Sequence, residues 1–104
     1  MNSEAFSVAV EQSGPPWIVR VTGEIDMATA PALERCLIGL ATDAVVVDFS
    51  GVVFMDSSGV AVLARAKKLA SDQNVAFSVR GLRSAQRRIL EITGLAEQLN
   101  LEDD

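Results

Sequence analysis

The chain has 104 residues, 49% of them hydrophobic, and a net charge of −5 from 9 Lys and Arg against 14 Asp and Glu. This length suits one domain over residues 1–104, and the acidic balance argues against nucleic acid or an anionic membrane surface as a partner. The chain has no His and one Cys, which excludes a Ser-His-Asp triad, an imidazole metal ligand and an internal disulfide.

The sequence carries no marks of a nucleotide-binding loop, a membrane span or a signal peptide. It has no Gly-rich phosphate loop, and no apolar run reaches the roughly 18 residues of a spanning helix. The first residues, Met-Asn-Ser-Glu, lack the basic start and apolar core of a signal peptide. We therefore expect a cytoplasmic binding module with no cofactor and no metal, rather than an enzyme.

The first part of the chain predicts a hairpin followed by a helix. Apolar residues alternate with polar or small ones over 6–10 and predict a strand, and a second strand over 17–21 follows a Gly-Pro-Pro turn. Residues 23–26 are expected to end this strand in a loop. A helix over 30–41 comes next, with Thr29 as its N-cap and a proline just inside its start.

The middle of the chain predicts a buried strand, a loop and a second helix. Residues 45–49 are almost continuously apolar, which is typical of a central strand covered on both faces. Because a buried carboxylate is costly without a partner, Asp48 is expected to reach the strand end or a loop N–H group. Residues 50–59 are predicted as a loop, and a helix then runs to about Asp72.

The last part predicts a strand over 75–79 and a third helix through about Ile92, with Ser84 as its cap and Gly94 as its stop. The tail over 95–101 is expected to add a short strand. The resulting order, β-β-α-β-α-β-α, predicts an α/β fold. Its mixed, mainly parallel sheet has an N-terminal hairpin and helices packed against it.

Two features of the helices allow alternative interpretations. Cys36 shares the apolar face of the first helix, so we interpret it as a buried inert thiol rather than a redox sensor. The third helix lies in a basic patch, which is either a solvated face that pairs with Glu91 or a docking surface for an acidic partner. We favour the solvated face for these four residues: Arg80, Arg83, Arg87 and Arg88.

Asp56, Ser57, Ser58 and Gly59 stand where an apolar stretch meets a helix start. Asp and Ser are preferred N-caps, and a cap contributes about 0.5–2 kcal/mol, but only one residue of this run can be the cap. A helix N-terminus also offers free N–H groups and a positive dipole end, which accept a serine phosphate without melting the helix. The run therefore fits either capping alone or reversible phosphorylation.

Two segments carry a family resemblance. Residues 45–60, VVVDFSGVVFMDSSGV, resemble the signature of the STAS domain of bacterial anti-sigma factor antagonists, and residues 21–30, VTGEIDMATA, resemble a second marked segment of that family. The spacing of the two segments and the predicted element order agree with the family fold, and the resemblance covers almost the whole chain.

The resemblance implies a phosphorylation switch at Ser57. In this family the unphosphorylated antagonist binds an anti-sigma factor and frees the sigma factor. The anti-sigma factor is also the serine kinase that phosphorylates the antagonist from ATP, and a separate phosphatase reverses the step. The antagonist itself supplies no catalytic group, and we expect a monomer.

The resemblance also places the loop over 23–29 beside the start of the second helix and implies a partner-binding surface around this loop and Ser57. In that surface Ser58 is the cap or a secondary contact, and Gly59 lets the partner backbone come close. Met27 is either an exposed anchor or part of the core. The expected partner-binding residues are Gly23, Glu24, Asp26, Met27, Thr29, Asp56, Ser58, Gly59 and Val60.

Two other functions remain to be distinguished from this switch. The first is a non-switching STAS adaptor in a signalling scaffold or a transporter-associated complex, in which Ser57 is never phosphorylated. The second is a small hydrolytic or nucleotide-binding protein with Ser57 as nucleophile, which lacks both a base and a phosphate loop in this sequence.

Overall fold

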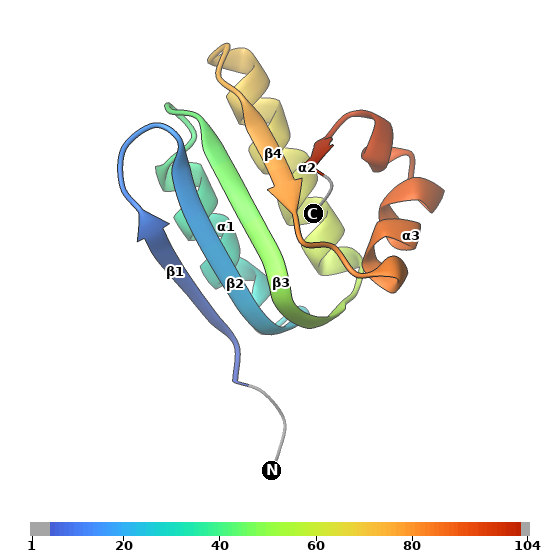
Figure 1. Ribbon diagram of the computed structural model, residues 1–104. Helices are drawn as coiled ribbons and strands as arrows, with labels where there is room; N and C mark the ends of the chain where they lie inside the picture. The colour runs from blue at the N-terminus through green and yellow to red at the C-terminus, as the bar shows by residue number, and fades with distance from the viewer. Residues whose placement is uncertain (1–4, 103–104) are drawn as a thin grey trace.

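The computed structural model describes residues 5–102, which form a five-stranded sheet with helices packed against it (Figure 1). β1 runs antiparallel to β2, and the later strands are parallel to their neighbours, which confirms the predicted mainly parallel sheet with an N-terminal hairpin. The strands lie in the sheet in chain order: β1 (Ser7–Gln12), β2 (Trp17–Ile25), β3 (Val45–Met55), β4 (Phe77–Arg80) and β5 (Asn100–Glu102).

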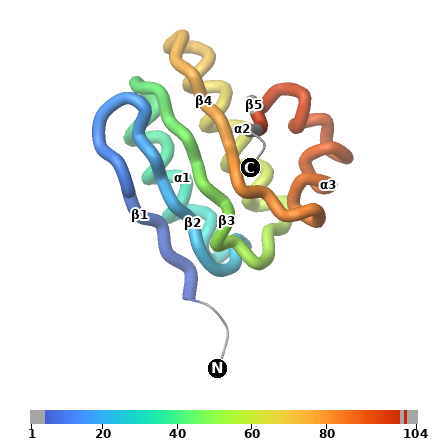
Figure 2. The backbone as a smooth tube through the Cα atoms, viewed as in Figure 1, coloured from blue at the N-terminus to red at the C-terminus, as the bar shows by residue number. Residues whose placement is uncertain are grey.

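Three α-helices and a 3₁₀ turn complete the structure. The helices are α1 (Ala30–Gly39), α2 (Ser57–Asp72) and α3 (Ser84–Ile92), and the turn is η1 (Leu95–Glu97). Figure 2 shows the chain passing from α3 through this turn to reach β5, which lies beside β4. The expected short strand in the tail is therefore present. None of the helices in the described part of the chain is long and apolar enough to cross a membrane.

Helices α1 and α2 cover one face of the sheet, and the hydrophobic core lies between them and the strands (Figure 1). The spacing of three and four that predicted these helices brings their buried side chains onto one side. Each large apolar side chain buried here contributes about 1.5–3 kcal/mol. The core includes Val19, Val21, Ile25, Leu33, Leu37, Val47, Phe49, Val62 and Leu63.

The other face of the sheet has no helix in front of β1, β2 and β3 within the part of the chain that the structure describes (Figure 1). Arg20 and Glu24 of β2 are exposed there, while their neighbours Val19 and Val21 are buried. Residues 45–49 of β3 are nevertheless buried apart from the half-buried Val46, as expected of a central strand, although within residues 5–102 no helix covers this second face in front of β3.

Both central strands are longer than the sequence predicted. β2 continues to Ile25, and β3 runs through Ser50 and Gly51 to Met55 instead of entering a loop. The two strands pair in parallel along this added length, so each satisfies the backbone of the other, and two register shifts absorb the irregularities. A Cβ at Gly51 would lie 2.7 Å from a methyl carbon of Thr22, so this glycine serves close approach rather than a turn.

The helix ends differ from expectation in detail. α1 ends at Gly39, and its N-cap residue Thr29 makes no side-chain capping hydrogen bond. Ser84 is the first residue of α3 and not its cap, because Arg83 occupies the N-cap position. Gly94 has a φ of 79° and lies just after α3, which confirms the predicted stop.

Asp48 is 7% exposed and finds two partners. Its Oδ1 accepts the Ser50 N–H at 2.8 Å, and its Oδ2 lies 3.3 Å from the Arg80 guanidinium on β4. Burial alone raises the pKa of this carboxyl, but the hydrogen bonds from Ser50 and the charge of Arg80 outweigh it, so the pKa lies below its usual value. The expected N–H partner is confirmed, and the predicted basic patch loses Arg80 to this ion pair.

Cys36 is half-buried on α1. Burial raises the pKa of its thiol, which keeps the sulfur protonated and weakly nucleophilic.

Candidate functional site

The ends of β2 and β3 lie side by side and bring the two marked sequence segments together. Ile25 and Met55 are register partners at these ends, and the Asp56 N–H donates to the Ile25 carbonyl oxygen at 3.1 Å. The loop after β2 and the start of α2 therefore leave the sheet at the same edge, which is the lower edge in Figure 1. The implied placement of the 23–29 loop beside the start of the second helix is confirmed.

The loop between β2 and α1 is held by its own side chains. Asp26 Oδ1 accepts the Ala28 N–H at 2.9 Å and the Thr29 N–H at 3.1 Å. The Thr29 hydroxyl donates to the Glu24 carbonyl oxygen at 2.8 Å and accepts the Asp26 N–H at 2.9 Å. These bonds explain why Thr29 does not cap α1, and they leave Met27 standing 81% exposed in the loop. Of the two alternatives for Met27, the structure shows the exposed one.

The start of α2 settles which residue is the cap. Asp56 has extended backbone geometry, and its carboxylate accepts the Ser58 N–H at 2.8 Å. Asp56 is therefore the N-cap, and the alternative of Ser58 as the cap is wrong. Ser57 is the first helical residue and is exposed, while Ser58 is half-buried. Within the part of the chain that the structure describes, the Ser57 hydroxyl makes no hydrogen bond.

Two glycines expected at the partner surface face the interior instead. Gly59 is buried, and a Cβ there would lie 2.5 Å from Met55 Cγ and 3.0 Å from Ile25 Cγ2. Gly23 is also buried with a φ of 87°, and a Cβ there would lie 2.8 Å from the Phe6 Cα. Both glycines therefore let the chain pack against itself. Gly59 therefore serves internal packing, and not the close approach of a partner backbone that the sequence implied.

The remaining expected partner residues lie at the ends of β2 and β3 and at the start of α2, and they include the side chains that give this edge its charge. Glu24 is exposed, whereas Asp26, Asp56 and Val60 are half-buried. None of the three carboxylates forms an ion pair within residues 5–102. No group of three or more His, Cys, Asp or Glu residues that could hold a metal ion occurs among the described residues. The edge is therefore acidic, with an exposed hydroxyl at its centre.

Sequence reasoning missed an apolar surface beside this edge. Val53 and Phe54 are 40% and 49% exposed at the end of β3, where a register shift between Gly23 and Glu24 of β2 leaves Val53 without a partner. This bulge turns two consecutive side chains outward. The signal in the sequence was the run of four apolar residues over 52–55, which was assigned to a loop.

The fold is a mainly parallel α/β domain. Its site consists of an exposed serine at a helix start, beside a loop that Asp26 and Thr29 hold in place. The sequence matches the STAS domain over residues 7–104, and the chain belongs to this family. The resemblance drawn from the two marked segments is confirmed.

Similar proteins match this chain over most of their length. The anti-sigma-F factor antagonist RsfB of Mycobacterium tuberculosis is 32% identical over 101 residues, which cover 94% of this chain and 82% of RsfB. The crystal structure of an anti-sigma factor antagonist from Mycobacterium paratuberculosis superposes with a TM-score of 0.82 at 35% identity, covering 93% of this chain and 85% of that one. The anti-sigma factor antagonist SpoIIAA in its unphosphorylated form gives a TM-score of 0.77 at 18% identity, covering 96% and 88%, a likeness of fold alone.

Proposed function

We propose that the protein is an anti-sigma factor antagonist whose unphosphorylated form binds an anti-sigma factor and releases a sigma factor. The observation that carries the proposal is the exposed, unbonded hydroxyl of Ser57 on the first turn of α2. The partner carries serine-kinase activity and phosphorylates Ser57, and a separate phosphatase restores the binding form. The protein is not an enzyme and acts as a monomer in the cytoplasm.

The geometry supports Ser57 rather than Ser58 as the acceptor. A kinase needs a hydroxyl that can enter its own site, and Ser57 is exposed and makes no hydrogen bond to the residues that the structure describes. Ser58 is half-buried, and its backbone N–H is already engaged by the Asp56 cap. A phosphate on Ser57 would lie at the positive end of α2, so the helix would keep its form.

The acidic edge gives phosphorylation its effect on binding. A phosphate adds about −1.5 to −2 charge at neutral pH to a surface that already carries Glu24, Asp26 and Asp56. Like charges facing each other across an interface cost several kcal/mol, and about 1.4 kcal/mol is a factor of ten in affinity. A partner fitted to the unmodified edge therefore loses at least tenfold in affinity, with no change of fold in this domain.

The test uses Ser57→Ala and Ser57→Asp, first as baits in lysate of the native host and then in titration calorimetry with the purified anti-sigma factor that the Ser57→Ala bait retains. Ser57→Ala should bind like the wild type and accept no phosphate, while Ser57→Asp should bind at least tenfold more weakly.

Ser71→Asp is the matched control because Ser71 is exposed on the same helix. It lies about 20 Å from Ser57 at 1.5 Å per residue, beyond a Debye length of about 8 Å. Equal affinities for the two Ser57 variants would exclude the switch and favour a non-switching STAS adaptor.

A further inference from the structure

We propose that a cleft between the end of β3 and α3 receives an apolar side chain of the anti-sigma factor, flanked by carboxylates, and that this contact belongs to the same interface as Ser57. The inference rests on the proposed function and specifies the chemistry of its partner. This β3–α3 cleft is lined by Val53, Phe54, Arg83, Ala85, Gln86 and Ile89.

The cleft is held in place by a buried hydrogen-bonded side chain. Gln86 is 3% exposed, and its Nε2 donates to the Val52 carbonyl oxygen at 2.9 Å. Its Oε1 accepts the Arg83 N–H at 3.1 Å. One side chain thus fastens the start of α3 to the bulged end of β3, so the two walls of the cleft are fixed relative to each other before any partner arrives.

The size and lining of the cleft define what fits it. Its volume is about 160 Å³, whereas pockets for small ligands and cofactors span roughly 300–1,000 Å³, so it suits a single side chain. Val53 and Phe54 expose apolar surface at its mouth, and Ile89 lies on the opposite wall. Protein interfaces concentrate their affinity in apolar pockets that a partner side chain fills.

The charge around the cleft indicates what should flank the incoming side chain. Arg83 lines the cleft, and Arg88 lies three residues after the lining residue Ala85 on α3, which makes the two neighbours on the helix surface. Both arginines are exposed in a chain whose net charge is −5, and neither forms an ion pair within residues 5–102. Arg80 is held by Asp48 and does not contribute. An apolar anchor with neighbouring carboxylates therefore complements the cleft in both shape and charge.

The cleft is continuous with the switch surface. Phe54 lines the cleft and lies three residues before Ser57, where the chain leaves β3 and enters α2. Phe54 is also the register partner of Glu24 at the end of β2. One partner surface that covers Ser57 therefore also reaches the cleft. A phosphate on Ser57 would prevent the partner's apolar side chain from entering the cleft.

The test blocks the cleft and reverses its charge. Ala85→Trp fills the cleft from an exposed helix position, and Arg83→Glu replaces a rim cation by an anion. The probe is the purified anti-sigma factor retained by the Ser57→Ala bait, and affinities are measured by titration calorimetry. Ala85→Trp should bind at least tenfold more weakly. Arg83→Glu should bind several-fold more weakly, with a loss that shrinks as salt is raised.

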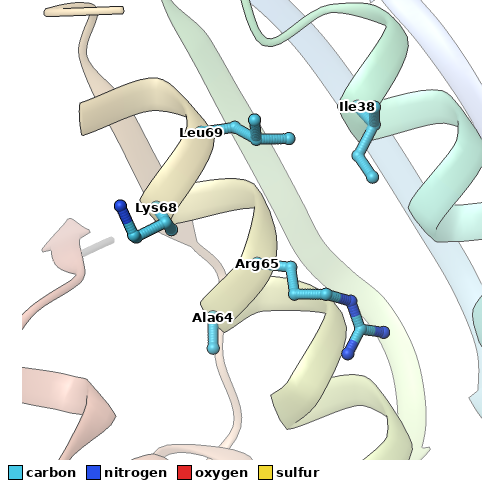
Figure 3. A pocket seen from close by; sticks show the side chains of 5 residues that line it. All are labelled: Ile38, Ala64, Arg65, Lys68 and Leu69. Atoms are coloured by element: carbon cyan, nitrogen blue, oxygen red, sulfur yellow. The ribbon is translucent and has the colours of Figure 1, made fainter. Parts of the chain in front are cut away.

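Matched controls come from α1 and α2, which border a groove seen in Figure 3 with Ile38 opposite Leu69. Its cations are already engaged, since Arg65 is bound to Glu34 at 2.7 Å. Ala64→Trp in this groove and Arg35→Glu on α1 are exposed changes of the same kind and should bind like the wild type. Urea midpoints of all four variants establish that each is folded.

The outcomes separate the inference from the proposed function. If Ala85→Trp and Arg83→Glu both bind like their controls while Ser57→Asp loses binding, the cleft is not part of the interface and the switch stands. If Ser57→Asp also binds normally, the proposed function fails and the inference fails with it. If the wild type sediments as a dimer and Ala85→Trp as a monomer, the occupant is a second copy of the chain and the inference is overturned.

Discussion

Gly59→Ala should destabilise the protein, although alanine is the better residue for a helix interior. The new Cβ would lie 2.5 Å from Met55 Cγ and 3.0 Å from Ile25 Cγ2, and both side chains are buried at the strand ends that support the site. Overpacking of this kind costs about 1–3 kcal/mol, and the helix gains about 0.5–1 kcal/mol from the loss of glycine. The net loss is about 1 kcal/mol, or roughly 4–8 °C in Tm for a domain near this size.

Urea unfolding followed by circular dichroism measures this change, and Gly39→Ala is its matched control. Gly39 is the last residue of α1, and a Cβ there would meet no atom within 4 Å. That variant should gain about 0.4–1 kcal/mol because the unfolded chain loses freedom. The two substitutions are chemically identical, so their difference isolates the packing term. If Gly59→Ala proves as stable as Gly39→Ala, the packing argument at the strand ends is refuted.

Three further predictions concern two buried polar residues. Asp48→Ala should cost about 1–3 kcal/mol because the Ser50 N–H loses its acceptor, and an unchanged urea midpoint would contradict this. Because folding lowers the pKa of Asp48, its ionised form stabilises the wild type above the unfolded pKa of about 3.9. This contribution disappears as pH falls through the lower folded pKa, so Asp48→Asn should show a weaker acid dependence of the midpoint. Gln86→Leu should lower the free energy of unfolding by about 1–3 kcal/mol in the same assay, since the Val52 carbonyl is left unpaired. A stability equal to the wild type would show that water replaces the Gln86 amide as its partner.

Local sequence patterns were sufficient for the helices and for the buried half of β3. Leu33 and Leu37 repeat at helical spacing, and the apolar run over 45–49 is typical of a strand inside a sheet. The extension of β3 was not predictable in this way. Ser50 and Gly51 resemble a turn locally, and only the pairing with β2 makes them part of a strand. That pairing joins residues far apart in the chain, which no local pattern records.

The position of the candidate site was predictable from the sequence, but the separate roles of its residues were not. The Asp-Ser-Ser run indicated a helix start, but choosing Asp56 as the cap requires knowledge of where α2 begins. Gly59 gave no sign that it packs inward against β2. Gln86 belongs to no motif at all, and its role exists only because α3 is folded against the bulge in β3.

The uncovered face of the sheet protects the protein from stacking on itself. Arg20, Asp48 and Arg80 are register partners across β2, β3 and β4, so a row of alternating charge crosses this face. A second sheet could cover that row only by stripping water from the exposed Arg20 and the half-buried Arg80, which is costly. The edge strand β1 adds Glu11, which pairs with Arg20 at 3.7 Å. Self-association through the broad face of the molecule is thus opposed by the charged groups that cross it.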